Sequence, residues 1–174
     1  SLDQLDPNGT YTYADYLLWR LEERIELIKG KIFKMSPAPS VRHQEIAVHL
    51  TGVLWNHFRG KECKVFAAPF DVRLPKKNIK KSSKLHTVVQ PDLCVVCDLS
   101  KLDERGCEGA PDLIIEILSP GNSHKEMREK FEVYEESGVQ EYWIVNPTER
   151  MVQVFLLDEK EGKFYGIRPF IEGD

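Results

Sequence analysis

The run Leu113-Ile114-Ile115-Glu116-Ile117-Leu118 decides the fold. Nearly continuous aliphatic sequence of this length is typical of a central strand that is buried on both faces. Pro120-Gly121 then leads into a segment of helical periodicity that ends at Gly138, and a further strand is predicted at 141–145. A strand, a helix and a strand in this order predict a crossover between parallel neighbours. We therefore predict an α/β (α+β) fold with a mixed central sheet.

The segments around this unit predict a second long helix and two hairpins. Ser40 is a helix cap, and apolar residues recur at helical spacing from 41 to 58. An N-terminal hairpin is predicted at 25–35 around the Lys29-Gly30 turn, and a C-terminal hairpin turns at 146–148. The remaining predicted elements are a short helix at 12–19 and strands at 70–74, 92–96, 151–157 and 163–167.

Length and composition predict one folded domain over 1–174, because 174 residues suffice for a single core. Hydrophobic residues make up 41% and charged residues 30%, which excludes a disordered or fibrous chain. The net charge of −4 argues against a protein whose main task is to coat nucleic acid electrostatically. No apolar run approaches the roughly 18–20 residues of a membrane span, so we expect a cytoplasmic protein with no membrane partner.

The cysteines Cys63, Cys94, Cys97 and Cys107 are expected to be reduced thiols, because a chain of this size needs no disulfides for its stability. Cys94 and Cys97 form a C-x-x-C pair, but residues three apart in a strand point to opposite faces, so no zinc site is predicted. No glycine-rich phosphate-binding motif is present, and no nucleotide cofactor is expected.

Glu116 is the most informative residue, because its charge lies inside a run that otherwise predicts sheet core. Burying an unpaired carboxylate costs several kcal/mol, so Glu116 must be neutralised, paired with a helix lysine or arginine, or bound to a metal. Asp92 opens the preceding predicted strand, directly after Pro91. If the two strands are neighbours, the two carboxylates lie about 5 Å apart and can hold one divalent cation. Two carboxylates completed by waters suit Mg²⁺ (or Mn²⁺).

Asp112 also follows a proline but is not predicted to share this ion. Four residues of extended strand separate it from Glu116 by roughly 13 Å, so we predict a capping or turn role for Asp112.

The order of the elements, with Pro91-Asp92 on the second of three strands and Glu116 on the third, resembles the PD-(D/E)XK nuclease superfamily. Within it, the chain is similar to the bacterial Uma-two family of restriction endonucleases over about residues 12–157. The stretches that carry this likeness are 26–32, 35–37, 111–120 and 138–143, together with His43, Pro91-Asp92, Lys130 and Tyr134.

This resemblance implies a Mg²⁺-dependent hydrolase of nucleic-acid phosphodiesters, DNA above all, in which Asp92 and Glu116 hold the metal. The superfamily places a lysine two residues after the glutamate, where this chain has Leu118. Lys130 is the candidate replacement, because it shares a helix stripe with Tyr134 and can face the sheet, and the Uma-two pattern also has a lysine there. The alternatives are a surface position for Lys130 and a substitute amine from Lys125.

Glu26 and His43 complete the predicted catalytic cluster. The resemblance places Glu26 near the site as a further metal or water ligand, and the alternative is an exposed residue beside the Lys-Gly turn. His43 lies on the inward face of the helix at 41–58, where it is either part of the site or a hydrogen-bonded core histidine.

The single basic tract of the sequence is a predicted loop. Its lysines are expected either to contact nucleic-acid phosphates without reading sequence or to be solvated: Lys76, Lys77, Lys80, Lys81 and Lys84.

Two rival functions remain open at the level of sequence. A non-catalytic nucleic-acid-binding or assembly module is favoured by Leu118 and by the acidic net charge. A small-molecule hydrolase using the same carboxylates is the weaker rival. For the nuclease, the resemblance implies a two-fold homodimer, because duplex cleavage needs two active sites.

Overall fold

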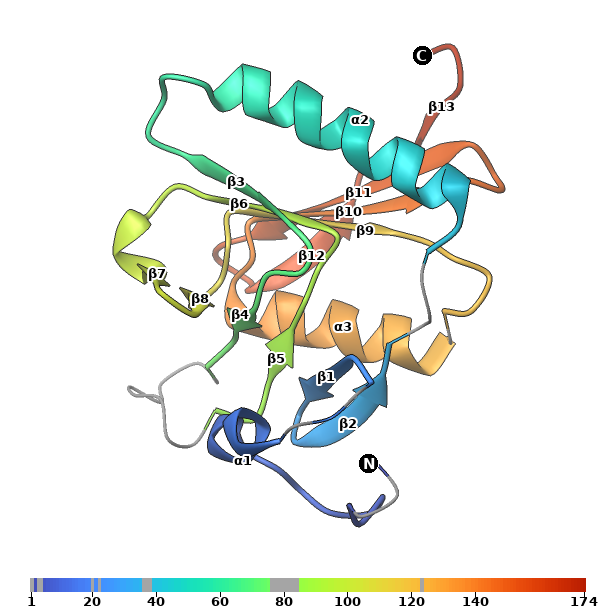
Figure 1. The fold of residues 1–174 in the computed structure, drawn as a ribbon. Coiled ribbons are helices and arrows are strands. Elements are labelled where there is room, and N and C mark those ends of the chain that lie inside the picture. The colour runs from blue at the N-terminus through green and yellow to red at the C-terminus, as the bar shows by residue number, and fades with distance from the viewer. Residues whose placement is uncertain are drawn as a thin grey trace.

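The computed structural model describes residues 2, 5–19, 21, 23–35, 39–75, 85–122 and 124–174. A mixed sheet lies at its centre, with the strand order β12-β11-β10-β9-β6-β3 and with β13 paired to β11 (Figure 1). The bounds of these strands are β3 (Lys64–Ala67), β6 (Leu93–Val96), β9 (Leu113–Ile117), β10 (Glu141–Asn146), β11 (Met151–Asp158), β12 (Lys163–Gly166) and β13 (Phe170–Ile171).

A second sheet of short strands has the order β2-β1-β5-β4-β8-β7. Its bounds are β1 (Ile25–Ile28), β2 (Lys31–Lys34), β4 (Val72–Arg73), β5 (Val88–Val89), β7 (Leu102–Asp103) and β8 (Gly106–Glu108). The helices are α1 (Tyr13–Leu18), α2 (Val41–Phe58) and α3 (His124–Ser137), with a 3-10 turn at Leu99–Lys101.

The two long helices cover opposite faces of the central sheet, and α3 lies between this sheet and the β1–β2 hairpin (Figure 1). Successive side chains of β9 point alternately toward α2 and toward α3. Ile115 and Ile117 pack in the core cluster on the α2 side, whereas Ile114 packs with Tyr134 of α3. Burial on both faces explains why the β9 sequence is almost entirely aliphatic.

Most of the predicted elements are confirmed. The helix at 41–58 has the predicted bounds, with Ser40 accepting the backbone N–H of His43 at 3.2 Å. The hairpin at 25–35 is β1 and β2. The crossover after β9 is also confirmed, because β10 pairs with β9 in parallel. The mixed α+β fold class is therefore as predicted.

The predicted strand at 70–74 is wrong in extent and in place. Only Val72–Arg73 forms a strand, and it pairs with β5 and β8 of the second sheet. The neighbour of β6 is instead β3, a four-residue strand that sequence alone did not indicate. Pro69 and the contacts of Asp71 with Gln90 and Cys107 turn the chain away from the central sheet before Val72 is reached.

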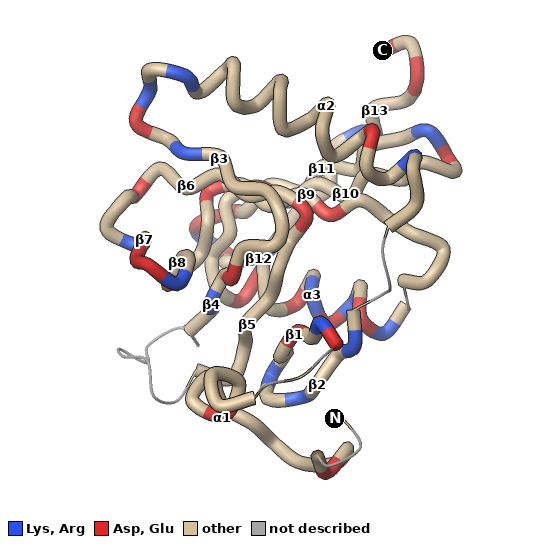
Figure 2. The backbone as a smooth tube through the Cα atoms, viewed as in Figure 1, with Lys and Arg blue, Asp and Glu red and all other residues tan. Residues whose placement is uncertain are grey.

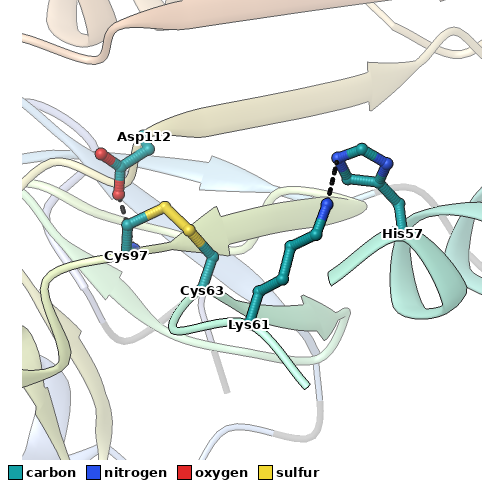
Figure 3. The surroundings of a disulfide bond; sticks show 5 residues. All are labelled: His57, Lys61, Cys63, Cys97 and Asp112. Carbon is teal, nitrogen blue, oxygen red and sulfur yellow. Dashed lines mark hydrogen bonds between the residues drawn. A yellow bond between two sulfur atoms is a disulfide. The ribbon is translucent and has the colours of Figure 1, made fainter. Parts of the chain in front are cut away.

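The expectation of four reduced thiols is also wrong, because Cys63 and Cys97 form a disulfide with an S–S distance of 2.08 Å (Figure 3). Lys64 pairs with Val96 across β3 and β6, so the next residues outward face each other. A chain of this size does not need a disulfide for its stability, but the register of the two strands decides whether one forms. Cys94 and Cys107 are buried thiols, and burial raises the pKa of both.

None of the helices in the described part of the chain has the length and apolar character that would allow it to cross a membrane.

Candidate active site

Asp92 and Glu116 face each other across two neighbouring strands. Leu93 of β6 pairs with Ile115 of β9, so one residue further the register brings Asp92 opposite Glu116. Opposite positions of this kind have Cβ atoms within about 5.5 Å. Asp92 Oδ2 accepts the backbone N–H of Ile117 at 2.7 Å, which holds the carboxylate against β9.

Glu116 is 9% exposed and receives two hydrogen bonds on the same oxygen. Lys130 Nζ donates to Oε1 at 3.0 Å, and the Tyr134 hydroxyl donates to it at 2.6 Å. The pKa of Glu116 is raised to about 7, mainly by burial and also by the charges of Asp92 and Glu26, although the ammonium of Lys130 opposes the shift. Glu116 therefore holds a proton more readily than an ordinary glutamate does.

Lys130 is 6% exposed and forms ion pairs with three carboxylates. Its Nζ lies 2.9 Å from Glu26 Oε2, 3.0 Å from Glu116 Oε1 and 3.8 Å from Glu126 Oε1. Burial lowers the pKa of Lys130, but the carboxylates of Glu116 and Glu26 outweigh burial and hold it above the ordinary value. The ammonium therefore stays charged within the protein.

Glu26 reaches this cluster from the second sheet. Its position in the middle of β1 makes it 1% exposed, and its Oε1 accepts the backbone N–H of Gln90 at 2.7 Å. Lys130 of α3 thus connects Glu26 of one sheet with Glu116 of the other.

His43 approaches Asp92 from the opposite side of the central sheet. It lies in the first turn of α2, and its Nε2 is 3.2 Å from Asp92 Oδ2. His43 is 7% exposed, so the inward orientation predicted from the helical spacing is confirmed.

A pocket of about 690 Å³ opens beside these groups and is lined by His43, Asp92, Glu116, Glu126 and Lys130, among others. No hydrogen bond from the described residues reaches Asp92 Oδ1 or Glu116 Oε2. Both carboxylates therefore have one oxygen available.

The donor set fits a divalent cation that keeps most of its waters. Across the described ranges, no three His, Cys, Asp or Glu side chains are grouped so as to hold an ion by themselves. Mg²⁺ commonly binds through one or two carboxylates plus waters, which is what Asp92 and Glu116 offer. The excess of carboxylates over the single ammonium of Lys130 favours a cation electrostatically.

The structure brings together Glu26, His43, Asp92, Glu116 and Lys130, all of them predicted site residues. The lysine tract Lys76, Lys77, Lys80, Lys81 and Lys84 lies outside the described residues. The candidate substitute amine Lys125 is exposed, with its Nζ 5.8 Å from the Phe33 ring centre. Asp112 Oδ2 accepts the backbone N–H of Cys97 at 2.7 Å, which is the predicted turn role.

Sequence reasoning missed the contributions of Gln90 and Tyr142. Gln90 fixes Glu26 through its backbone N–H, a contact that leaves no side-chain signature. Tyr142 lies on the strand parallel to β9 and lines the pocket, and its buried hydroxyl has no hydrogen-bond partner within the described ranges.

The architecture, with two opposed carboxylates on adjacent central strands and a buried lysine beside them, is that of a restriction-endonuclease-like protein. The chain belongs to the Uma2 family, described as "Putative restriction endonuclease", whose model matches residues 13–171. The family predicted from sequence is confirmed.

Two relatives are similar over most of the chain. An uncharacterized protein of Synechocystis sp., slr1290, is 26% identical over 144 residues, or 81% of this chain and 71% of that protein. The crystal structure of a putative nuclease of the DUF820 family from Anabaena variabilis has a TM-score of 0.72 at 23% identity, and the alignment covers 94% of this chain and 86% of that one. The second likeness confirms the fold.

Proposed function

We propose that the protein is a divalent-metal-dependent endonuclease that hydrolyses phosphodiester bonds of nucleic acid, with DNA as its substrate. The observation that carries this proposal is the opposed pair Asp92 and Glu116, both of which line the pocket. A Mg²⁺ or Mn²⁺ ion bound there supplies a Lewis acid for the phosphoryl oxygen and lowers the pKa of a bound water.

The residues of the chain have separate roles in this proposal. Asp92 and Glu116 hold the ion, and the backbone N–H of Ile117 orients Asp92. Lys130 neutralises part of the carboxylate charge and stabilises charge on the reacting phosphate. Glu26 and Tyr134 fix the positions of Lys130 and Glu116.

Leu118 is the observation that favours the rival function, a non-catalytic nucleic-acid-binding module. It lies two residues after Glu116, where the superfamily has its lysine, and it lines the pocket. The ammonium of Lys130 lies 3.0 Å from Glu116, so α3 supplies a positive charge next to the carboxylate although β9 does not. Because Lys130 can replace the lysine that is missing from β9, we favour the enzyme over the binding module.

The test is metal-dependent cleavage of plasmid and single-stranded circular DNA by the wild-type protein. We expect cleavage with Mg²⁺ or Mn²⁺ and none with excess chelator. Asp92→Asn preserves the size of the side chain and removes its charge, so it should lose both cleavage and calorimetric Mg²⁺ binding. A wild-type protein that binds DNA without cleaving it under any of these metals would favour the binding module.

The homodimer remains a prediction of this proposal. A closed two-fold pair would present two pockets to one duplex. Light scattering at micromolar concentration should give twice the mass of the chain, and a monomeric mass would contradict the dimer.

A further inference from the structure

One exposed face of α2 carries no charge although it borders the pocket. From Ile46 to Phe58 the sequence contains no Lys, Arg, Asp or Glu, and this part of the tube is tan in Figure 2. Val48 is 69% and Trp55 53% exposed. Residues at spacings of three and four share one helix face, and four such residues line the pocket of Asp92 and Glu116: Gln44, Val48, Gly52 and Trp55.

Trp55 is an accessible aromatic platform at the far end of this face. The guanidinium carbon of Arg59, the residue that follows α2, lies 5.4 Å from the centre of the Trp55 ring in a cation–π contact. One turn earlier, a Cβ added to Gly52 would meet no atom within 4 Å, so the space in front of the helix is open there.

The turn that follows α2 concentrates positive charge beside Trp55. Arg59 and Lys61 lie in the turn and Lys64 begins β3, and all three are exposed, against the single acid Glu62 (Figure 2). Lys61 Nζ lies 3.3 Å from His57 Nε2, which directs the ammonium back toward α2 (Figure 3). An aromatic platform flanked by cations is the arrangement that binds single-stranded nucleic acid.

The distance between Trp55 and the candidate catalytic carboxylates matches the length of a short stretch of nucleic-acid strand. His43 contacts Asp92, and Trp55 is twelve residues further along the same helix. At 1.5 Å per residue the separation is about 18 Å. This length corresponds to about five nucleotides of a strand that keeps the helical rise of roughly 3.4 Å per nucleotide.

We propose that Trp55 stacks on an unpaired base of the nucleic-acid substrate, with Arg59 and Lys61 contacting the adjoining phosphates. The proposal rests on the proposed function and specifies its substrate as nucleic acid with a single-stranded segment. A base inside a duplex has both faces covered by its neighbours, so only an unpaired base is free to stack on the indole.

The test is the fluorescence anisotropy of labelled oligothymidylate of 20 nucleotides and of a 20-base-pair duplex, both in chelator so that binding is measured without cleavage. Wild-type protein should bind the single strand more tightly than the duplex. Trp55→Ala should weaken single-strand binding by about tenfold, whereas Trp55→Phe should retain most of the affinity. Arg59→Ala and Lys61→Ala should each reduce the salt slope of binding by about 0.7.

Tyr165→Ala is the matched control, because Tyr165 is 51% exposed on β12, outside the pocket lining. Equal effects of Trp55→Ala and Tyr165→Ala on single-strand binding, or tighter binding of the duplex, would overturn the proposal. Thermal melting of each variant excludes a folding effect. A protein that shows the Trp55 effect but never cleaves DNA would leave this inference standing and contradict the proposed function alone.

Discussion

Lys130→Met is expected to lower the free energy of unfolding by about 3–5 kcal/mol and to reduce metal-dependent cleavage by roughly 10²–10³. The stability loss follows because Glu26 and Glu116, both buried, would face each other without the ammonium that lies 2.9 Å and 3.0 Å from them. The rate loss follows if this ammonium stabilises charge on the reacting phosphate. Denaturant unfolding and single-turnover cleavage measure the two effects.

A second variant separates stability from catalysis. Glu26→Gln combined with Lys130→Met removes one charge of each sign, and the amide oxygen introduced on β1 can still accept the backbone N–H of Gln90. Since a buried ion pair replaced by neutral groups of similar size often costs little, the double variant should recover part of the stability, although Glu116 still lacks the ammonium, and none of the rate. Its Mg²⁺ affinity should stay close to that of the wild type, because one nearby charge of each sign has gone.

Lys125→Met is the matched control on the same helix. Lys125 is exposed, so its replacement should change stability by less than about 0.5 kcal/mol and leave cleavage intact. A double variant that cleaves at the wild-type rate would remove Lys130 from the mechanism. Loss of cleavage in Lys125→Met instead would transfer the role to that amine.

The sequence predicts those elements that a cap or a repeated apolar spacing marks over many consecutive residues. The bounds of α2 follow from the Ser40 cap and from repeated apolar spacing over 18 residues. The strand β5 has only two residues, too few for alternation to stand out, and β3 is defined by its pairing with β6. The Cys63–Cys97 disulfide was missed for the same reason, because it depends on the β3–β6 register.

Some residues of the candidate site can be predicted from local sequence, and others cannot. Glu116 could be found from the sequence, because a charge in an aliphatic run needs a partner, and its ion pair with Lys130 supplies one. The position of Glu26 depends on how the second sheet docks on α3, which no local pattern encodes. For that residue the family resemblance gave information that periodicity did not contain.

The disulfide gives the second large expected effect. Cys63 and Cys97 are 34 residues apart, and closing a loop of this length stabilises a protein by about 2–4 kcal/mol, mainly by restricting the unfolded chain. Replacing both cysteines with serine should therefore lower Tm by roughly 4–16 °C, at about 2–4 °C per kcal/mol for a chain of this size. Calorimetry without reductant measures the change.

Reduction of the wild-type protein provides the control for this experiment. A phosphine reductant should lower the wild-type Tm by a similar amount and leave that of the double serine variant unchanged, since the remaining Cys94 and Cys107 are buried thiols in the structure. Because Cys63 closes the turn that carries Arg59 and Lys61, reduction should also weaken single-strand binding. The bond itself can be tested by alkylating protein that was unfolded without reductant. If all four cysteines react, the disulfide does not form, and reduction should then change neither the Tm nor single-strand binding.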